Sequence, residues 1–244
     1  MLGINEKYKV NKKISISTFI NKDLDSKEKS RLREYIKSIV LTFQISGEEI
    51  VSVVNEKVNC QVIMFFDVEI KNIKNARYVG EILQRQIKPL CLIRLFDDNK
   101  ECYCFAEKRL NELDKNEIVI DSIVLTKSIS LYFSDNIKEL LNKYLTIRNL
   151  KNFTDKYTIY MESMIKAYII SNPQIYPYII ELLESKIWYT FPKYNELYRL
   201  LKNIDLQQTN LIKCNETKEK IKINELLKKY KDEIKCLVCG GIKK

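Results

Sequence analysis

The run of residues 60–70 constrains the fold of this 244-residue chain more than any other segment. It reads Cys-Gln-Val-Ile-Met-Phe-Phe-Asp-Val-Glu-Ile and is apolar almost without interruption. Such a strand is typical of the middle of a sheet, where both of its faces are covered. We therefore predict that residues 60–71 form a central strand.

Extended and helical patterns alternate on both sides of this strand. Apolar residues at helical spacing predict helices at about 26–39, where Ser26 is a candidate N-cap, and at about 75–88, before Pro89. Further strands are predicted at 40–46, 90–96 and 101–107, and within 117–132. Residues 97–100 have the composition of a hairpin turn.

After about residue 133 the apolar residues recur at helical spacing. We expect helices near Asp135 and Thr154, a helical segment at 177–202 whose aromatic residues belong to the core, and a last helix at 216–236. The fold class is therefore predicted to be α+β. A small mixed sheet with flanking helices would occupy residues 1–132, and a helical region with a basic terminal helix would occupy residues 133–244.

The composition excludes several kinds of chemistry. The chain contains no histidine, which removes Ser-His-Asp and Cys-His triads, histidine general bases and metal sites that include histidine. Neither a G-x-x-x-x-G-K-[ST] loop nor a G-x-G-x-x-G run is present, so the usual sequence signatures of phosphate binding are missing. The residues thus describe an architecture more clearly than an activity.

The net charge of +10 lies entirely at the two ends of the chain. Residues 1–37 and residues 213–244 each carry 10 basic and 5 acidic side chains, whereas residues 38–212 carry 22 of each. This distribution is compatible with a basic surface for nucleic acid or an acidic partner. Solvated lysines in a chain rich in Ile, Lys and Asn explain the distribution slightly better.

Six lysines of the last predicted helix are the candidate residues for binding nucleic acid or a partner. They are Lys218, Lys220, Lys222, Lys228, Lys229 and Lys231. Acidic residues are interleaved with them, which favours ion pairs between residues four apart on a solvated helix over a continuous phosphate-binding track.

Asp67, Glu69 and Lys71 are the candidate catalytic residues if the protein is an enzyme. On a strand these three side chains share one face, because side chains alternate between the two faces. A Glu-x-Lys strand before a helix is the arrangement of PD-(D/E)XK nucleases, in which carboxylates hold Mg²⁺ and the lysine assists the attacking water. The alternative is a strand that ends in solvent, and no clear carboxylate precedes it except Glu48, Glu49 and Glu56.

The seven cysteines include one C-x-x-C pair, Cys236 and Cys239, followed by two glycines. This is half of a zinc knuckle, and Zn²⁺ needs four ligands. Cys102 and Cys104, or Cys214 with a strand cysteine, are the candidates to complete it; otherwise the pair is unoccupied. The odd cysteine count, the polar residues 1–13 and the short apolar runs predict a cytoplasmic protein with reduced thiols that does not bind membranes.

Three segments resemble the bacterial DUF4391 family. They are the opening Met1-Leu2-Gly3 with Val10–Ile14 and Phe19, the strand at 60–71 with the entry Ile87–Ile93 into the next strand, and the lysine-rich run Lys220–Lys229. The resemblance covers residues 1–145 and 213–235. It implies an accessory role beside helicases and DNA methyltransferases in restriction-like or phage-defence loci, and it carries over no catalytic residue.

The leading hypothesis is a non-catalytic accessory protein of a DNA-processing or defence system, without a cofactor. Its helical, basic end would dock a partner protein, such as a helicase or methyltransferase, or nucleic acid in a salt-dependent manner. The alternatives are a Mg²⁺-dependent PD-(D/E)XK-like nuclease and a small zinc-knuckle nucleic-acid-binding protein.

Overall fold

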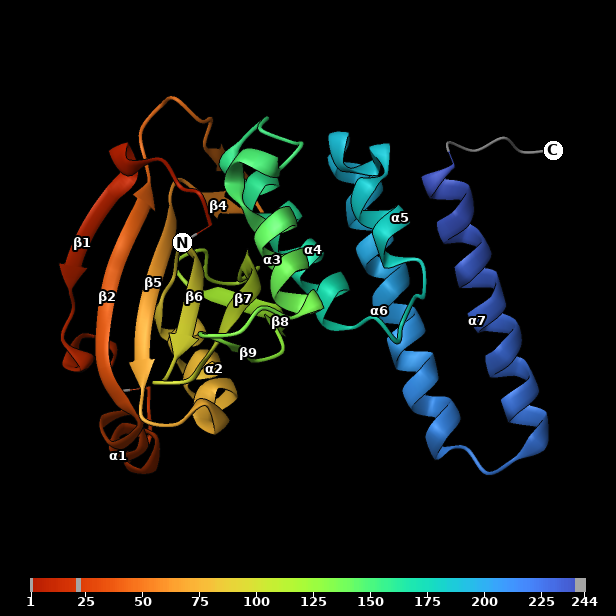
Figure 1. The fold of residues 1–244 in the computed structure, drawn as a ribbon, viewed down its shortest axis with the longest axis horizontal. Helices are drawn as coiled ribbons and strands as arrows, with labels where there is room; N and C mark the ends of the chain where they lie inside the picture. Colours follow the sequence, from red (N-terminus) through yellow and green to blue (C-terminus); the bar gives the residue numbers. More distant parts are fainter. Residues whose placement is uncertain (1, 21–22, 240–244) are drawn as a thin grey trace. The chain divides into compact units, whose positions relative to one another are not determined.

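The computed structural model describes residues 2–20 and 23–239, in which a mixed sheet is followed by a helical region (Figure 1). The predicted α+β class is confirmed. The chain forms two compact units, residues 1–171 and residues 172–244. The expected division at residue 132 differs from this boundary, because the two helices that follow it pack in the unit that contains the sheet.

The main sheet has the strand order β1-β2-β5-β6-β7-β8, and β9 pairs with β7. A separate two-stranded ribbon pairs β3 with β4. The strands are β1 (Lys9–Lys13), β2 (Ile36–Ile45), β3 (Val53–Val54), β4 (Asn59–Cys60), β5 (Ile63–Ile70), β6 (Leu90–Phe96), β7 (Lys100–Leu110), β8 (Ile118–Leu125) and β9 (Ile129–Ser130).

The predicted central strand is confirmed as β5, which pairs antiparallel with β2 and parallel with β6. It is shorter than the predicted 60–71, because Cys60 pairs with Val53 in the β3–β4 ribbon and β5 ends at Ile70. The edge strand β1 pairs antiparallel with β2, and its register is irregular between Lys9 and Lys12. Asn11, within that irregularity, has a φ of 50°. All five residues of β1 are exposed.

The helices of the first unit are α1 (Ser26–Tyr35), α2 (Ala76–Gln86), α3 (Asn136–Leu145) and α4 (Lys156–Ser171), with 3₁₀ turns at Glu6–Tyr8, Ile16–Phe19, Ile73–Asn75 and Ile147–Asn149. Asp25, one residue before the predicted cap, begins α1 with a capping box, in which its side chain accepts from Glu28 N–H. The helix expected at 26–39 ends at Tyr35. Ile36 already pairs with Ile70 of β5, so sheet pairing overrides the helical spacing.

The two faces of the sheet are covered differently. On one face, Phe66 and Val68 of β5 join a core with α1 and α2, and α2 approaches closely at Gly80. A Cβ atom at Gly80 would lie 2.9 Å from Cys104 Sγ. On the other face α4 packs against β7 and β8, and the Tyr160 hydroxyl donates to a backbone carbonyl of Ala106 at 2.9 Å.

The second unit contains α5 (Ile179–Glu184), the 3₁₀ turn Lys186–Tyr189, α6 (Phe191–Lys213) and α7 (Thr217–Val238). The two long helices α6 and α7 form an antiparallel hairpin (Figure 1). Trp188 is fully buried against Tyr194, and its indole N–H donates to the Leu182 carbonyl at 2.7 Å. The predicted core role of these aromatic residues is confirmed, although Tyr178 and Tyr189 are exposed. Within the described ranges, every helix is too short or too polar to cross a bilayer.

Candidate functional sites

Asp67 and Glu69 lie on the face of β5 that points away from α2, as the alternation predicts. On the neighbouring strand β2, Val40 lies opposite Asp67 and Ser38 lies opposite Glu69, so this strand supplies no carboxylate. Lys71 follows the end of β5 and is exposed, and its backbone N–H donates to the Tyr35 carbonyl. Strand β5 therefore contains Asp67 and Glu69 of the predicted face but ends at Ile70, before Lys71.

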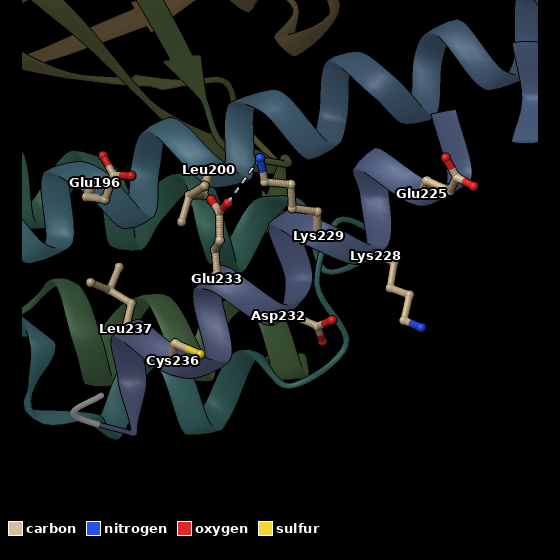
Figure 2. A pocket seen from close by; sticks show the side chains of 9 residues that line it. All are labelled: Glu196, Leu200, Glu225, Lys228, Lys229, Asp232, Glu233, Cys236 and Leu237. Atoms are coloured by element: carbon tan, nitrogen blue, oxygen red, sulfur yellow. Dashed lines mark ion pairs between the residues drawn. The ribbon is translucent and has the colours of Figure 1, made fainter. Parts of the chain in front are cut away.

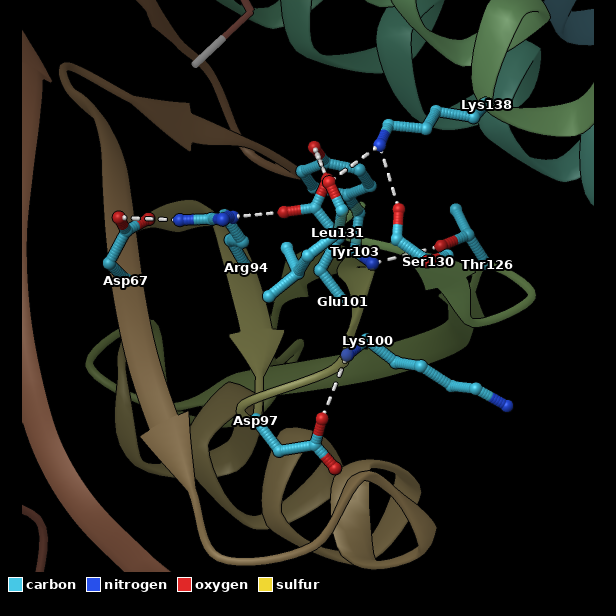
Figure 3. A network of polar contacts seen from close by, with 10 residues as sticks. All are labelled: Asp67, Arg94, Asp97, Lys100, Glu101, Tyr103, Thr126, Ser130, Leu131 and Lys138. Carbon is cyan, nitrogen blue, oxygen red and sulfur yellow. Dashed lines mark hydrogen bonds and ion pairs between the residues drawn. The ribbon is translucent and has the colours of Figure 1, made fainter. Parts of the chain in front are cut away.

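Asp67 belongs to a cluster of charges that spans three strands (Figure 3). Arg94 of β6 lies between two carboxylates, at 3.1 Å from Asp67 Oδ2 and 2.5 Å from Glu101 Oε2. The Tyr103 hydroxyl donates to the second carboxylate oxygen of Glu101 at 3.2 Å. We call Asp67, Arg94, Glu101 and Tyr103 the sheet-face cluster.

Burial governs the electrostatics of the sheet-face cluster. It raises the pKa of Asp67, although the Arg94 guanidinium acts in the opposite direction. Burial also disfavours the Arg94 cation, but Glu101 and Asp67 outweigh it and raise the pKa of Arg94. Asp67 Oδ1 is buried and has no hydrogen-bond partner within the described part of the chain.

Glu69 is also bound by a cation. Lys37 Nζ lies 3.3 Å from Glu69 and 3.3 Å from Asp98, and the Ser38 hydroxyl donates to Glu69 at 3.2 Å. Across residues 2–20 and 23–239, no group of three or more cysteine, aspartate or glutamate side chains is arranged to hold a metal ion. Each carboxylate of the predicted nuclease pair thus takes part in an ion pair that ties neighbouring segments of the sheet together.

Sequence reasoning missed Arg94 and Glu101. Their role depends on the pairing of β6 with β5 and β7, which joins residues that are far apart in the chain. A local signal was present, since Arg94 is the single charged residue of a strand that is otherwise apolar. A charge in such a strand requires a partner of opposite sign.

The structure does not gather the six candidate lysines of α7 on one face. Lys218, Lys222 and Lys229 are separated by four and seven residues and share one flank of the helix, whereas Lys220 and Lys231 lie on the opposite flank. Between the flanks, α7 buries Ile223, Leu227 and Ile234. Lys229 pairs with Glu233 at 3.9 Å, which is an ion pair of the predicted spacing.

An open groove of about 840 Å³ lies along α6 and α7 (Figure 2). Its exposed surface is mostly apolar, and the residues that line it are Glu196, Leu200, Glu225, Lys228, Lys229, Asp232, Glu233, Cys236 and Leu237. Four carboxylates and two ammonium groups line the groove, and two further cations, Arg199 and Lys235, pair with Glu196 and Asp232, so its charges are mixed. Sequence reasoning missed the groove because α6 supplies one of its walls.

The C-x-x-C pair lies at the end of α7, where Cys236 is in the last turn and Cys239 is the C-cap. Both side chains are exposed, and the two glycines after them fall outside the described residues. The candidates to complete a zinc site are placed differently. Cys102 and Cys104 are buried in the core of the first unit, and burial raises the pKa of Cys102 to about 12. Cys214 precedes α7, at the opposite end of that helix.

Comparison with protein families finds a match that covers nearly the whole chain. The model of a family described as "Domain of unknown function (DUF4391)" matches residues 2–234, including the helical stretch between the segments that carried the sequence resemblance. Searches of curated proteins and of solved structures returned no match.

Proposed function

The chain belongs to the DUF4391 family, and on this premise we propose that it is a non-catalytic accessory protein that docks another protein through α6 and α7. The observation that carries the proposal is the open, mostly apolar groove between these helices. Contiguous apolar surface that folding leaves open is characteristic of protein interaction sites. Two further apolar side chains of α7, Ile221 and Leu226, are 55% and 38% exposed.

The charges around the groove favour a protein over nucleic acid as the partner. Binding to a phosphate backbone requires several basic side chains along one track. On α7 the lysines are divided between two flanks, and carboxylates line the groove. The charges of the groove are therefore mixed and do not form a continuous phosphate-binding track.

The resemblance implies which partner to test first. Members of the family are expected beside helicases and DNA methyltransferases in restriction-like or phage-defence loci. We therefore propose that the groove docks a helicase or methyltransferase of such a system. The nuclease alternative has less support, because Asp67 and Glu69 each engage a cation.

The docking proposal is tested by co-expression with any helicase or methyltransferase that the neighbouring genes encode, followed by a binding titration of the purified proteins. The variant Cys236→Glu/Leu237→Glu places charge on the apolar lining of the groove and should weaken the complex by at least about tenfold, or about 1.4 kcal/mol. The matched control is Leu113→Glu, because Leu113 is 98% exposed in the first unit.

Two results would oppose the proposal. One is a complex that tolerates Cys236→Glu/Leu237→Glu while the variant keeps its native helix content. The other is cleavage of DNA or RNA in Mg²⁺ or Mn²⁺ by the native chain that disappears in Glu69→Ala/Lys71→Ala, which would establish the nuclease alternative.

A further inference from the structure

We propose that Cys236 and Cys239 bind one Zn²⁺ ion together with the same two cysteines of a second copy of the chain. Each copy supplies two thiolates, so the site is complete only when both copies are present. The inference goes beyond the docking proposal, because it concerns a metal ion and a second copy of this chain.

The spacing of the two thiols suits a tetrahedral metal ion. Both side chains are exposed, and the Cys239 N–H still donates to the Lys235 carbonyl at 2.9 Å, so the helical turn continues to this residue. Side chains three residues apart on a helix have Cβ atoms about 5–6 Å apart. Zinc–sulfur bonds of about 2.3 Å place two ligating sulfur atoms about 3.8 Å apart. Rotation about the Cα–Cβ bonds covers this difference, so the pair can fill two of four ligand positions.

The same chain offers no further ligands to this pair. In residues 2–20 and 23–239, no group of three or more cysteine, aspartate or glutamate side chains can hold a metal ion. Cys214 precedes α7, and the length of that helix separates it from the pair by about 30 Å. The remaining thiols are buried in the first unit, and burial raises the pKa of each; they are Cys60, Cys91, Cys102 and Cys104.

A second copy supplies the two missing ligands with the same chemistry. Structural zinc sites are closed by four protein ligands, and four cysteines are a common set. Two identical pairs related by a two-fold axis through the ion provide this set, and a two-fold contact is complete after two copies. The expected stoichiometry is therefore one ion for two chains.

The charges beside the pair suit the zinc-thiolate centre. Zn²⁺ displaces one proton from each of the four thiols, which leaves a centre of charge −2. Residues 228–239 carry four lysines and two carboxylates, an excess of two positive charges in each copy. Lys235, which precedes Cys236, has a side chain that is 60% exposed. The negative centre therefore offsets the repulsion between two basic helix ends.

The position on α7 favours a metal ion over a redox-active disulfide. Low-pKa thiols of redox-active pairs lie at helix N-termini, whose partial positive charge stabilises the thiolate. Cys236 and Cys239 lie at the C-terminal end of α7, where the partial charge is negative. A divalent cation, and not the helix, therefore has to supply the positive charge that stabilises both thiolates.

The experiment titrates Zn²⁺ into the full chain after reduction and removal of metal by a chelator. We expect one Zn²⁺ for two chains and a doubling of the mass measured by light scattering. Co²⁺ in place of Zn²⁺ should give the absorption of a tetrahedral ion with four thiolate ligands. The alkylation rates of Cys236 and Cys239, which are high in the metal-free chain, should decrease at least about tenfold, because the thiolates are bound.

Substitution of the two cysteines identifies the site. Cys236→Ser/Cys239→Ser should abolish both metal binding and the zinc-dependent doubling of mass. Because both side chains are exposed, the variant should keep its native helix content. The matched control is Cys214→Ser in the same unit, which should keep metal binding and the doubling of mass. A doubling that persists in Cys236→Ser/Cys239→Ser would overturn the inference.

Three other results would also overturn it. They are one Zn²⁺ for each chain with no change in mass, no Zn²⁺ binding by the reduced chain, and a dimer that resists the chelator but is lost on reduction. The last result would show disulfides between two copies. The docking titration is carried out with a chelator present, so that Cys236→Glu/Leu237→Glu tests the groove alone. Failure of docking and failure of zinc binding are therefore separate results.

Discussion

The two units of the chain differ in how they place some of their charged side chains. The first unit contains a buried pair: Glu162 and Lys166 of α4 are almost fully buried and lie 2.5 Å apart, whereas other pairs of this unit, such as Arg77 with Glu81, are exposed. In the second unit, charges on α7 face solvent, and the ion pair between Lys229 and Glu233 is exposed. Removal of one partner from a buried ion pair strongly lowers the free energy of unfolding, whereas exposed ion pairs contribute little to it.

Lysine side chains of the first unit also donate hydrogen bonds to backbone carbonyls of that unit. The Lys108 ammonium group donates to the carbonyls of Ile87 and Pro89, at 2.5 and 3.1 Å. Lys138 and Lys156 likewise donate to backbone carbonyls. Basic side chains therefore have two roles in this chain: Lys108, Lys138 and Lys156 bind backbone carbonyls of the first unit, whereas the lysines of α7 lie on a solvated surface.

We expect the alkylation rates of cysteine thiols to show the largest difference between the two units. Cys60, Cys91, Cys102 and Cys104 are buried in the first unit, whereas Cys236 and Cys239 of the second are exposed. A buried thiol reacts only when the structure opens, which at an opening free energy of about 5 kcal/mol slows the reaction roughly 10³- to 10⁴-fold.

The check is mass spectrometry during timed alkylation of the native protein. We expect rapid labelling of Cys236 and Cys239, and slower labelling of Cys214, whose Sγ donates to Glu219 at 3.2 Å. Fast labelling of Cys91 or Cys104 would break the contrast between the two units.

Glu162→Ala should produce the largest loss of stability. The Glu162 carboxylate accepts from the backbone N–H groups of Lys151 and Asn152, at 2.9 and 2.8 Å, and from Lys166. Its removal leaves a buried ammonium group without its carboxylate, which costs about 3–5 kcal/mol. The measurement is urea unfolding. The control Glu225→Ala, on exposed α7, should change stability by less than about 0.5 kcal/mol, and a similar loss in both variants would contradict the comparison.

Arg94→Met should lower the free energy of unfolding by less than Glu162→Ala does. It leaves Asp67 and Glu101 without the guanidinium that separates them, at a cost of about 2 kcal/mol. The cost stays below that of the Glu162 change because the side chains of Arg94 and Asp67 are each 23% exposed. Arg77→Met on α2 is the control, since the Arg77 side chain is 68% exposed and its pair with Glu81 lies in solvent. Equal unfolding midpoints for the two variants would show that the sheet-face cluster does not stabilise the fold.

Asp67→Asn should have the smallest effect of these substitutions. Its effect on the free energy of unfolding should depend on pH. Because burial raises the pKa of Asp67, the folded state holds this proton more tightly than the unfolded state. Ionisation therefore lowers the free energy of unfolding as pH rises through the folded pKa. We expect the stability of Asp67→Asn relative to the native protein to be higher at pH 7 than near pH 4. A difference of opposite sign would mean that Arg94 outweighs burial.

Local patterns predicted the strands better than they predicted the sites. The run at 60–70 carries its own evidence for β5, and the turn at 97–100 separates β6 from β7 almost as expected. The end of α1 was misplaced because Ile36 and Ile39 suit a helix face and a strand equally, and pairing with β5 decides between them. The partners of Asp67 come from β6 and β7, so no local pattern contains the sheet-face cluster.

The edge strand β1 has a consequence for the solubility of the chain during folding. An open sheet edge offers unpaired backbone groups to the strand of another molecule, which is the first step of β-aggregation. Here that edge carries Lys9, Lys12 and Lys13, and its bulge at Asn11 interrupts the regular row of donors and acceptors. Two copies that approach edge to edge meet like charges and mismatched hydrogen bonds. We therefore expect this exposed, lysine-bearing edge to disfavour edge-to-edge association of the sheet.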